Sequence, residues 1–227
     1  MPLLGSAAML LSFDIDADAI AEHDRWHTHE HLPERLSIPG FLRGTRWIAT
    51  EGGPRYMVLY EVRSLETLAS EAYLSRLNNP TPWTSRMMPH YRGMRRGLCG
   101  VLGSFGFGQG GAAALIRFRP EESRAESLRR WLLEEALPAL PHLPGLGSAH
   151  LLQAAQAAAM TNEQRIRGAD RGVDAAIVLS GYDPAAVGAC AGKLSDDGGL
   201  RSRGAGDVSS ALYGCSYSLA RAELEAS

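Results

Sequence analysis

The feature that most constrains the fold of this chain is an internal repeat. The segment WHTHEHLPERLSIPGF (26–41) aligns without a gap with WLLEEALPALPHLPGL (131–146). The alignment places Trp26 over Trp131, an offset of 105 residues, and matches a Leu-Pro and a Pro-Gly step in each copy. A repeat indicates that each copy forms one supersecondary unit, and that the units complete a core together.

Shorter matches follow in the same order in both halves. They pair residues 10–13 with 115–118, 56–62 with 175–181, and 98–101 with 212–215. The glycine-rich run FGFGQGGAAA (105–114) lies between the two copies. We therefore predict two units, a first half over 1–107 that carries the site and a second, degenerate half over 108–227.

Each half is expected to run strand, helix, strand, strand, helix, strand, since apolar periodicity and Pro-Gly steps alternate in that order. In the first half we predict strands near 7–14, 42–50, 55–63 and 94–106, and helices near 17–36, 65–77 and 82–90. In the second half we predict strands near 112–119, 146–154, 173–181 and 209–220, and helices near 123–140 and 184–194. Two stretches rich in glycine and charge, 154–172 and 196–207, are predicted to be mobile surface loops.

The order βαββαβ is the ferredoxin-like plan. A four-stranded antiparallel sheet covered by helices on one face leaves its other face bare, and two copies can bury these bare faces together. The predicted fold class is therefore α+β, with two fused ferredoxin-like halves packed sheet to sheet as an intramolecular α+β barrel.

The first copy also resembles a known family. The run WHTHEHLPERLSIPGFLRGTRW followed by YMVLYEVRS is similar to the EthD-like branch of the dimeric α+β barrel superfamily. The resemblance covers most of 7–106 and, more faintly, 112–220, and it places His31 on the family's motif histidine. It implies the barrel fold, in a superfamily that includes cofactor-free monooxygenases, isomerases, lyases and haem-binding branches. The reaction must still be argued from the residues, because fold does not fix function.

Composition removes several classes of partner. A net charge of −2 and a pI near 6.4 provide no basic field for nucleic acid or an anionic membrane. We found no apolar run long enough to span a bilayer and no signal peptide. Three scattered cysteines show no disulfide or zinc spacing, so a reducing, cytoplasmic location is expected.

Four of the seven histidines lie within HDRWHTHEH (23–31). His23, His27 and His31 are four residues apart and share one helix face. Their counterparts at the same offset are Leu128, Leu132 and Ala136. That pattern describes a buried face, so we predict that the three imidazoles point toward the sheet and line a pocket, whereas His29 points to solvent. The alternative is a hydrogen-bonded or solvated helix face, and Pro33 could turn His31 off the stripe.

Other residues are candidates for the same pocket. Arg46 and Tyr60 are polar where the second copy has leucine, so both are predicted to bind substrate. The segment PTPWTSRMMPHYRGM (80–94) has no counterpart in the second half and could close the pocket; core packing is the alternative for it. The predicted substrate-binding set is His23, Arg46, Tyr60, Trp83, Met87 and His90.

An imidazole gains or loses a proton near neutral pH. We predict cofactor-free acid–base chemistry on an apolar, aromatic or enolisable small molecule, with His31 as base, His27 as second choice and Arg46 stabilising an oxyanion. No cofactor or metal is predicted, because HTHEH lacks the H-E-x-x-H spacing. The alternatives are a ligand-binding protein without turnover and a haem- or metal-binding barrel. The expected assembly is a pseudo-dimeric monomer or a homodimer.

Overall fold

A computed structural model describes residues 3–155, 161–168 and 170–225. The first half begins with β1, which is followed by one continuous helix. This helix consists of α1, a π-helical turn over His27–His31, and α2. The first half continues through β2, β3, α3, α4 and β4. The bounds are β1 Ala7–Ile15, α1 Ile20–Trp26, α2 Leu32–Leu36, β2 Phe41–Glu51, β3 Tyr56–Val62, α3 Glu71–Asn78, α4 Pro82–Met87 and β4 Tyr91–Gly106.

The second half follows a similar order, with α8 in the place of α3 and α4, and adds three short elements, α7, β7 and α9. The bounds are β5 Ala112–Pro120, α5 Ala125–Trp131, α6 Leu137–Ala139, β6 Leu146–Ala154, α7 Asn162–Arg167, β7 Arg171–Gly172, β8 Ala175–Gly181, α8 Pro184–Ser195, β9 Ala205–Ala220 and α9 Arg221–Glu225. The predicted elements of both halves are therefore present, with ends shifted by a few residues.

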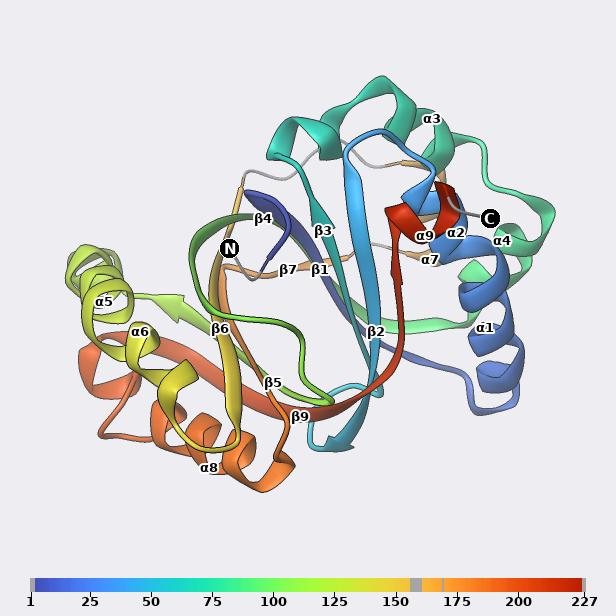
Figure 1. The fold of residues 1–227 in the computed structure, drawn as a ribbon. Helices are drawn as coiled ribbons and strands as arrows, with labels where there is room; N and C mark the ends of the chain where they lie inside the picture. The colour runs from blue at the N-terminus through green and yellow to red at the C-terminus, as the bar shows by residue number, and fades with distance from the viewer. Residues whose placement is uncertain (1–2, 156–160, 169, 226–227) are drawn as a thin grey trace.

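The strands close into a barrel, which confirms the predicted fold class. Their order is β1-β3-β2-β9-β5-β8-β6-β4, and a β1–β4 pairing closes the ring. All these pairings are antiparallel, and β7 adds a short parallel pairing to β4. The halves meet along β2–β9 and β4–β6. Figure 1 shows the helices of the first half on one side of this barrel and α5, α6 and α8 on the other.

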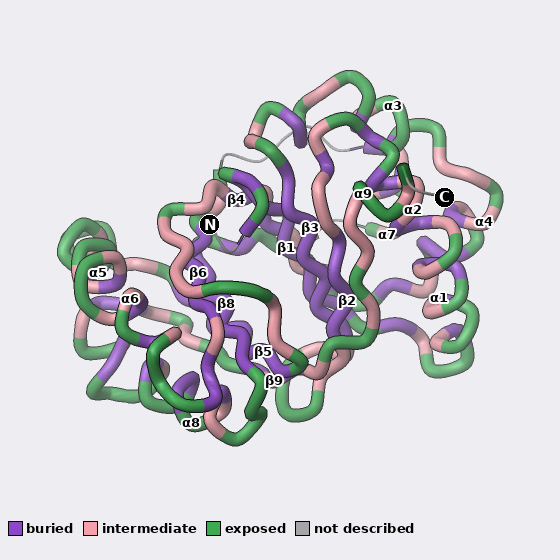
Figure 2. Tube along the Cα trace, in the orientation of Figure 1, coloured by how far each residue is buried: buried purple, intermediate pink, exposed green. Residues whose placement is uncertain are grey.

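Strand alternation divides the apolar side chains among three cores, because successive residues of a strand point to opposite faces. In β1, Met9 and Phe13 pack beneath the helices of the first half, whereas Ala8 and Leu10 point into the barrel. The second half has its own helix–sheet layer, around Phe118 and Leu132. Figure 2 shows this burial along the central strands. Side chains occupy most of the barrel interior, where a cavity beside Trp47 and His150 measures only about 10 Å³.

The two predicted surface loops contain regular elements, so the prediction was wrong for α7, β7 and the first residues of β9, whereas most of 196–204 is a turn. Residues 156–160 and 169 of the first stretch lie outside the described residues. The remainder forms α7 and β7, and Thr161 and Glu163 are buried. In the second stretch Leu200 is buried and β9 begins at Ala205. Low apolar periodicity concealed both segments, because each is held by a few polar contacts or one anchor residue.

No helix within the described part of the chain is long and apolar enough to cross a membrane.

Some elements that are far apart in the sequence lie close together in space. α7 packs against α3, and the C-terminal α9 packs against α2, so two segments of the second half cover the helices of the first (Figure 1).

Candidate functional site

The histidine stripe points inward, as the repeat predicted. His23, His27 and His31 are 0%, 1% and 7% exposed, whereas His29 is exposed. Adjacent ring centroids along the stripe are 5.4 Å and 5.6 Å apart. The three imidazoles therefore form one continuous row between helix and sheet.

Pro33 widens the helix instead of turning His31 away. Residues His27–His31 form a π-helical turn, and the amide of Leu32 donates to the carbonyl of His27. Proline has no N–H and clashes with the preceding turn of an α-helix, and a π turn relieves both defects. The second half repeats the device at Leu132–Ala136, just before its own Leu-Pro step. The shared wide turn keeps the stripe in register with the sheet below.

Phenols of the sheet face the imidazoles. The hydroxyl of Tyr91 lies 3.3 Å from His23 Nε2, and that of Tyr60 lies 3.5 Å from His27 Nε2. The ring of Tyr56 is 4.6 Å from that of His23, between centroids. Within the described residues, Nδ1 of His27 and Nδ1 of His31 are buried without a hydrogen-bond partner. A buried polar atom without a partner is uncommon and indicates a site that meets water or a ligand.

Burial sets the charge state of this row. It lowers the pKa of His23, and it lowers the pKa values of His27 and His31 well below that of a free imidazole. Neighbouring positive charges act in the same direction, chiefly His23 on His27 and Arg35 on His31. His27 and His31 are therefore neutral at pH 7 and can accept a proton.

Arg46 lies at the edge of the same layer. Its guanidinium donates to the backbone carbonyl of Asp24 over 3.1 Å and lies 3.7 Å from the Asp24 carboxylate. The hydroxyl of Tyr56 donates to that carboxylate over 2.8 Å. Burial opposes ionisation of Asp24, but hydrogen bonds from His23 and Tyr56 and the charge of Arg46 hold its pKa below the usual range. Arg46 is thus near His23, at the opposite end of the row from His31.

A small cavity of about 30 Å³ lies beside His31. Two phenols, Tyr60 and Tyr73, and two guanidiniums, Arg35 and Arg96, line it. Arg96 donates to the Tyr73 hydroxyl over 3.1 Å. The remaining lining residues are Met9, Leu11, Leu77, Thr161, Glu163, Gln164 and Arg167. At this end of the histidine row an imidazole, phenol hydroxyls and guanidiniums meet around open space.

The outer wall of that cavity comes from the second half. Glu163 of α7 accepts a hydrogen bond of 2.5 Å from Arg35, and both side chains are buried. Arg167 pairs with Asp170 at 2.8 Å and lies over the ring of Tyr91. A segment without a counterpart in the first half thus closes the first half's cavity.

The segment 80–94 takes a different place from the predicted one. Met87 is buried in the helix–sheet core, and Trp83 packs beneath Arg25 with 5.3 Å between guanidinium and ring. His90 is partly exposed and pairs with Asp16 at 3.2 Å. None of these three side chains lines the cavity beside His31. α4 packs against α1, so the segment contacts the histidine helix on the side away from the sheet.

Sequence reasoning missed Arg35, Tyr73, Arg96 and Glu163. A signal existed for Arg35, because its counterpart at the offset of 105 residues is Leu140. The same contrast, an arginine where the second copy has leucine, is the reason that Arg46 was predicted to bind substrate. Glu163 carried no such signal, since it lies in an insertion with no partner in the other half.

Comparison with known proteins identifies the fold and leaves the reaction open. No protein-family model matches the chain, and no curated protein matches its sequence. Among solved structures, an anthrone oxidase-like protein superposes with a TM-score of 0.65 at 13% identity, covering 97% of this chain and 96% of that one. A candidate monooxygenase of Fusobacterium nucleatum gives 0.61 at 7% identity, covering 96% of each chain.

Two further neighbours widen the range of chemistry. Chlorite dismutase of Candidatus Nitrospira defluvii gives a TM-score of 0.58 at 13% identity, covering 93% of this chain and 91% of that one. A haem-binding protein of Thermus thermophilus gives 0.52 at 11% identity, covering 98% and 95%. Proteins this distant share the dimeric α+β barrel fold with the chain, and fold alone does not transfer an activity.

The haem-binding neighbour makes haem the group to test against this site. The cavity beside His31 has room for about two water molecules, far less than a porphyrin needs. The residues as arranged do not fit haem. Within the described residues, no group of three or more histidine, cysteine or acidic side chains is placed to hold one metal ion.

Proposed function

We propose that the chain is a small-molecule enzyme of the EthD-like kind, in which His31 takes a proton from an enolisable or phenolic substrate without a cofactor. The observation that carries this proposal is the neutral, buried His31 beside a cavity that also holds Tyr60, Arg35 and Arg96. A neutral imidazole is the proton-accepting form, and guanidiniums stabilise the oxyanion that proton removal creates.

The proton step is simple to balance. The substrate's acidic C–H or O–H bond breaks, its proton passes to the free nitrogen of His31, and the electron pair remains on the substrate as an enolate or phenolate. We assign stabilisation of this negative charge to Arg35 and Arg96 and not to Arg46, because Arg46 lies beside His23 at the other end of the row. Burial raises the pKa of Tyr60, so its hydroxyl stays a hydrogen-bond donor. His27 is placed behind His31 and orients it through the row.

The cavity beside His31 is smaller than an aromatic ring, so entry of a small substrate must enlarge it, although by far less than entry of a porphyrin would. We infer that α7 supplies this room, because it is a short helix held to the first half mainly through polar pairs. This divides the chain into a first half, residues 1–107, that contributes the base, and a second half, residues 108–227, that contributes the frame and one wall. We propose that the halves arose by duplication and that the second copy lacks the histidines because it carries no base.

Replacing His31 with alanine is expected to lower kcat/KM about a hundredfold or more, because it removes the proton acceptor. The assay is exchange of an acidic C–H with deuterium oxide, followed by NMR over a panel of aromatic ketones and phenols. Anthrone belongs in this panel because one structural neighbour is named for it. His29→Ala is the matched control, since His29 is on the same turn but exposed. Equal exchange by wild type and His31→Ala would show that His31 is not the base.

The purified protein is expected to show no Soret band and to bind no hemin at micromolar concentrations, because the cavity has no room for a porphyrin. The measurement is an absorption titration with hemin, with His31→Ala as the comparison. A Soret shift that disappears in His31→Ala would instead favour the haem-binding alternative. Ligand binding without any exchange, oxidation or cleavage would favour the non-catalytic alternative.

A further inference from the structure

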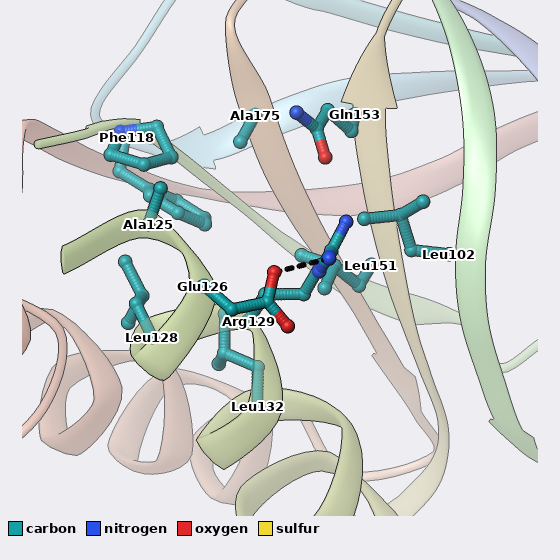
Figure 3. Close-up of a pocket in the computed structure, with 11 residues that line it drawn as sticks. Leu102, Phe118, Ala125, Glu126, Leu128, Arg129, Leu132, Leu151, Gln153 and Ala175 are labelled. Carbon is teal, nitrogen blue, oxygen red and sulfur yellow. Dashed lines mark hydrogen bonds and ion pairs between the residues drawn. The ribbon is translucent and has the colours of Figure 1, made fainter. Parts of the chain in front are cut away.

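A second and larger cavity lies in the other half, under α5. Its volume is about 90 Å³. Figure 3 shows Ala125 and Ala175 near Phe118, and the Arg129 side chain extended on the side of Leu102 and Gln153, where a dashed line marks its ion pair with Glu126. The other lining residues are Leu102, Phe118, Pro120, Glu126, Leu128, Leu132 and Leu151. The cavity is separate from the histidine row and from the cavity beside His31.

The strand register shows what occupies the same space in the first half. Phe118 of β5 pairs with Ala175 of β8, just as Phe13 of β1 pairs with Tyr56 of β3. The ring of Tyr56 stacks on that of Phe13 with centroids 5.4 Å apart and planes 25° apart. The second half has alanine in place of this tyrosine, so the ring-stacking face of Phe118 borders open space.

The residue that faces the hydroxyl of this tyrosine also differs between the two halves. In the first half the Tyr56 hydroxyl donates to Asp24 over 2.8 Å. The residue 105 positions after Asp24 is Arg129, so a negatively charged hydrogen-bond acceptor is replaced by a positively charged donor. Ile20 of the first half likewise corresponds to Ala125, which opens the mouth. The cavity therefore lies where the first half holds the Tyr56 ring, and Arg129 places the opposite charge near the position of the tyrosine oxygen.

We propose that this cavity binds a small aromatic carboxylate, with its ring on Phe118 between Ala125 and Ala175 and its carboxylate on Arg129. An aromatic carboxylate is ionised at pH 7, whereas an ordinary phenol is neutral there, so only the carboxylate matches the guanidinium. Gln153 can add a hydrogen bond, since its side chain reaches the same mouth and is exposed. The apolar walls exclude a longer polar substituent on the ring.

Glu126 does not prevent this binding. It pairs with Arg129 one turn along α5, but both side chains are largely exposed. Exposed ion pairs contribute little, so a carboxylate ligand can replace Glu126 at low free-energy cost. The cavity encloses the inner part of a ring and leaves the carboxylate at the mouth, which is where Arg129 lies.

The test is a titration of the intact protein with benzoate, followed by ligand-observed NMR and calorimetry, with benzyl alcohol as the neutral analogue. We expect a dissociation constant on the order of 1 mM for benzoate and weaker binding of the alcohol. Arg129→Leu should weaken benzoate binding about tenfold, the loss of one charge-assisted hydrogen bond. Arg130→Leu is the matched control, since Arg130 is the adjacent exposed arginine. Glu126→Gln should strengthen binding by up to about fivefold.

Filling the cavity distinguishes it from other places where benzoate could bind. Ala175→Tyr restores the side chain of the first half and should abolish binding, and Ala125→Ile should do the same from the helix side if the first variant folds poorly. Benzoate binding that survives both fillings, or that Arg129→Leu leaves unchanged, overturns the proposal, as does no binding by the folded wild type. His31→Ala should bind benzoate normally, so failure of this proposal and failure of the proposed catalysis are separate results.

Discussion

Lowering the pH from about 7.5 to about 5 is expected to lower the free energy of unfolding by about 6 kcal/mol, because the buried His27, His31 and His150 must be neutral in the folded state. His23, whose pKa burial also lowers, adds to this loss. Burial lowers the pKa values of His27 and His31 well below the unfolded value of 6.5, and it lowers that of His150 to about 4. Below pH 6.5 the unfolded chain therefore binds more protons than the folded chain. Stability from these groups is complete above that pH and is lost as the pH falls.

The expected slope is large. Each wholly neutral histidine contributes about 1.4 kcal/mol per pH unit, so three contribute about 4 kcal/mol per unit once the pH is well below 6.5. The folded state of a typical domain is only about 5–15 kcal/mol more stable than the unfolded state. Urea denaturation at a series of pH values measures the free energy of unfolding directly. The contribution of His150 ends near pH 4, where its folded form also takes up a proton.

The second half supplies the control for this measurement. His27→Leu copies Leu132, the buried leucine at the same position of the other helix, and should reduce the slope by about one third. His29→Leu should leave it unchanged, since His29 is exposed. A slope that His27→Leu does not alter would show that His27 is protonated in the folded state.

The repeat explains why so much of this layer was predictable. An aligned copy reports which positions of a helix face the sheet, because buried positions in the other copy are apolar. That comparison correctly oriented His23, His27 and His31 toward the sheet. Of these three and Arg46, however, only His31 borders the cavity, because Arg46 pairs with Asp24 at the other end of the row. The barrel fold was predicted from the same repeat, because two sheets that each have one bare face can bury both faces by packing against each other.

The same comparison could not find groups that come from unmatched segments. Glu163 belongs to an insertion of the second half, and its effect depends on which surface α7 covers. Tyr73 and Arg96 meet across α3 and β4, a contact between elements that sequence spacing does not encode. The pocket positions predicted for Trp83 and His90 were wrong. Both residues were assigned to the pocket only because their segment is unique to the first half, and they contact Arg25 and Asp16 instead.

The Arg35–Glu163 pair is expected to be the most sensitive single contact at the cavity. Arg35→Leu, which copies Leu140 of the second half, should destabilise the protein by about 3–5 kcal/mol. The cause is that Glu163 and Glu34 lose their shared counter-ion, at 2.5 Å and 3.2 Å, in a buried position. Urea denaturation at pH 7.5 measures the loss, and Arg76→Leu is the control because Arg76 lies 3.8 Å from Glu34 and is exposed.

The variants of Glu163 separate the stability of the fold from closure of the cavity. Glu163→Gln should cost less, about 1.5–3 kcal/mol, because Arg35 keeps Glu34 and the amide oxygen still accepts a hydrogen bond. The double variant Arg35→Leu/Glu163→Leu should recover part of the loss, since Glu163 is no longer buried without a counter-ion, although Glu34 still lacks Arg35. If α7 moves into water when its pair is broken, hydrogen exchange will rise at residues 161–168 without rising in β1. Increased exchange throughout β1 instead would mean that the pair holds the whole layer together, and that substrate must enter by another route.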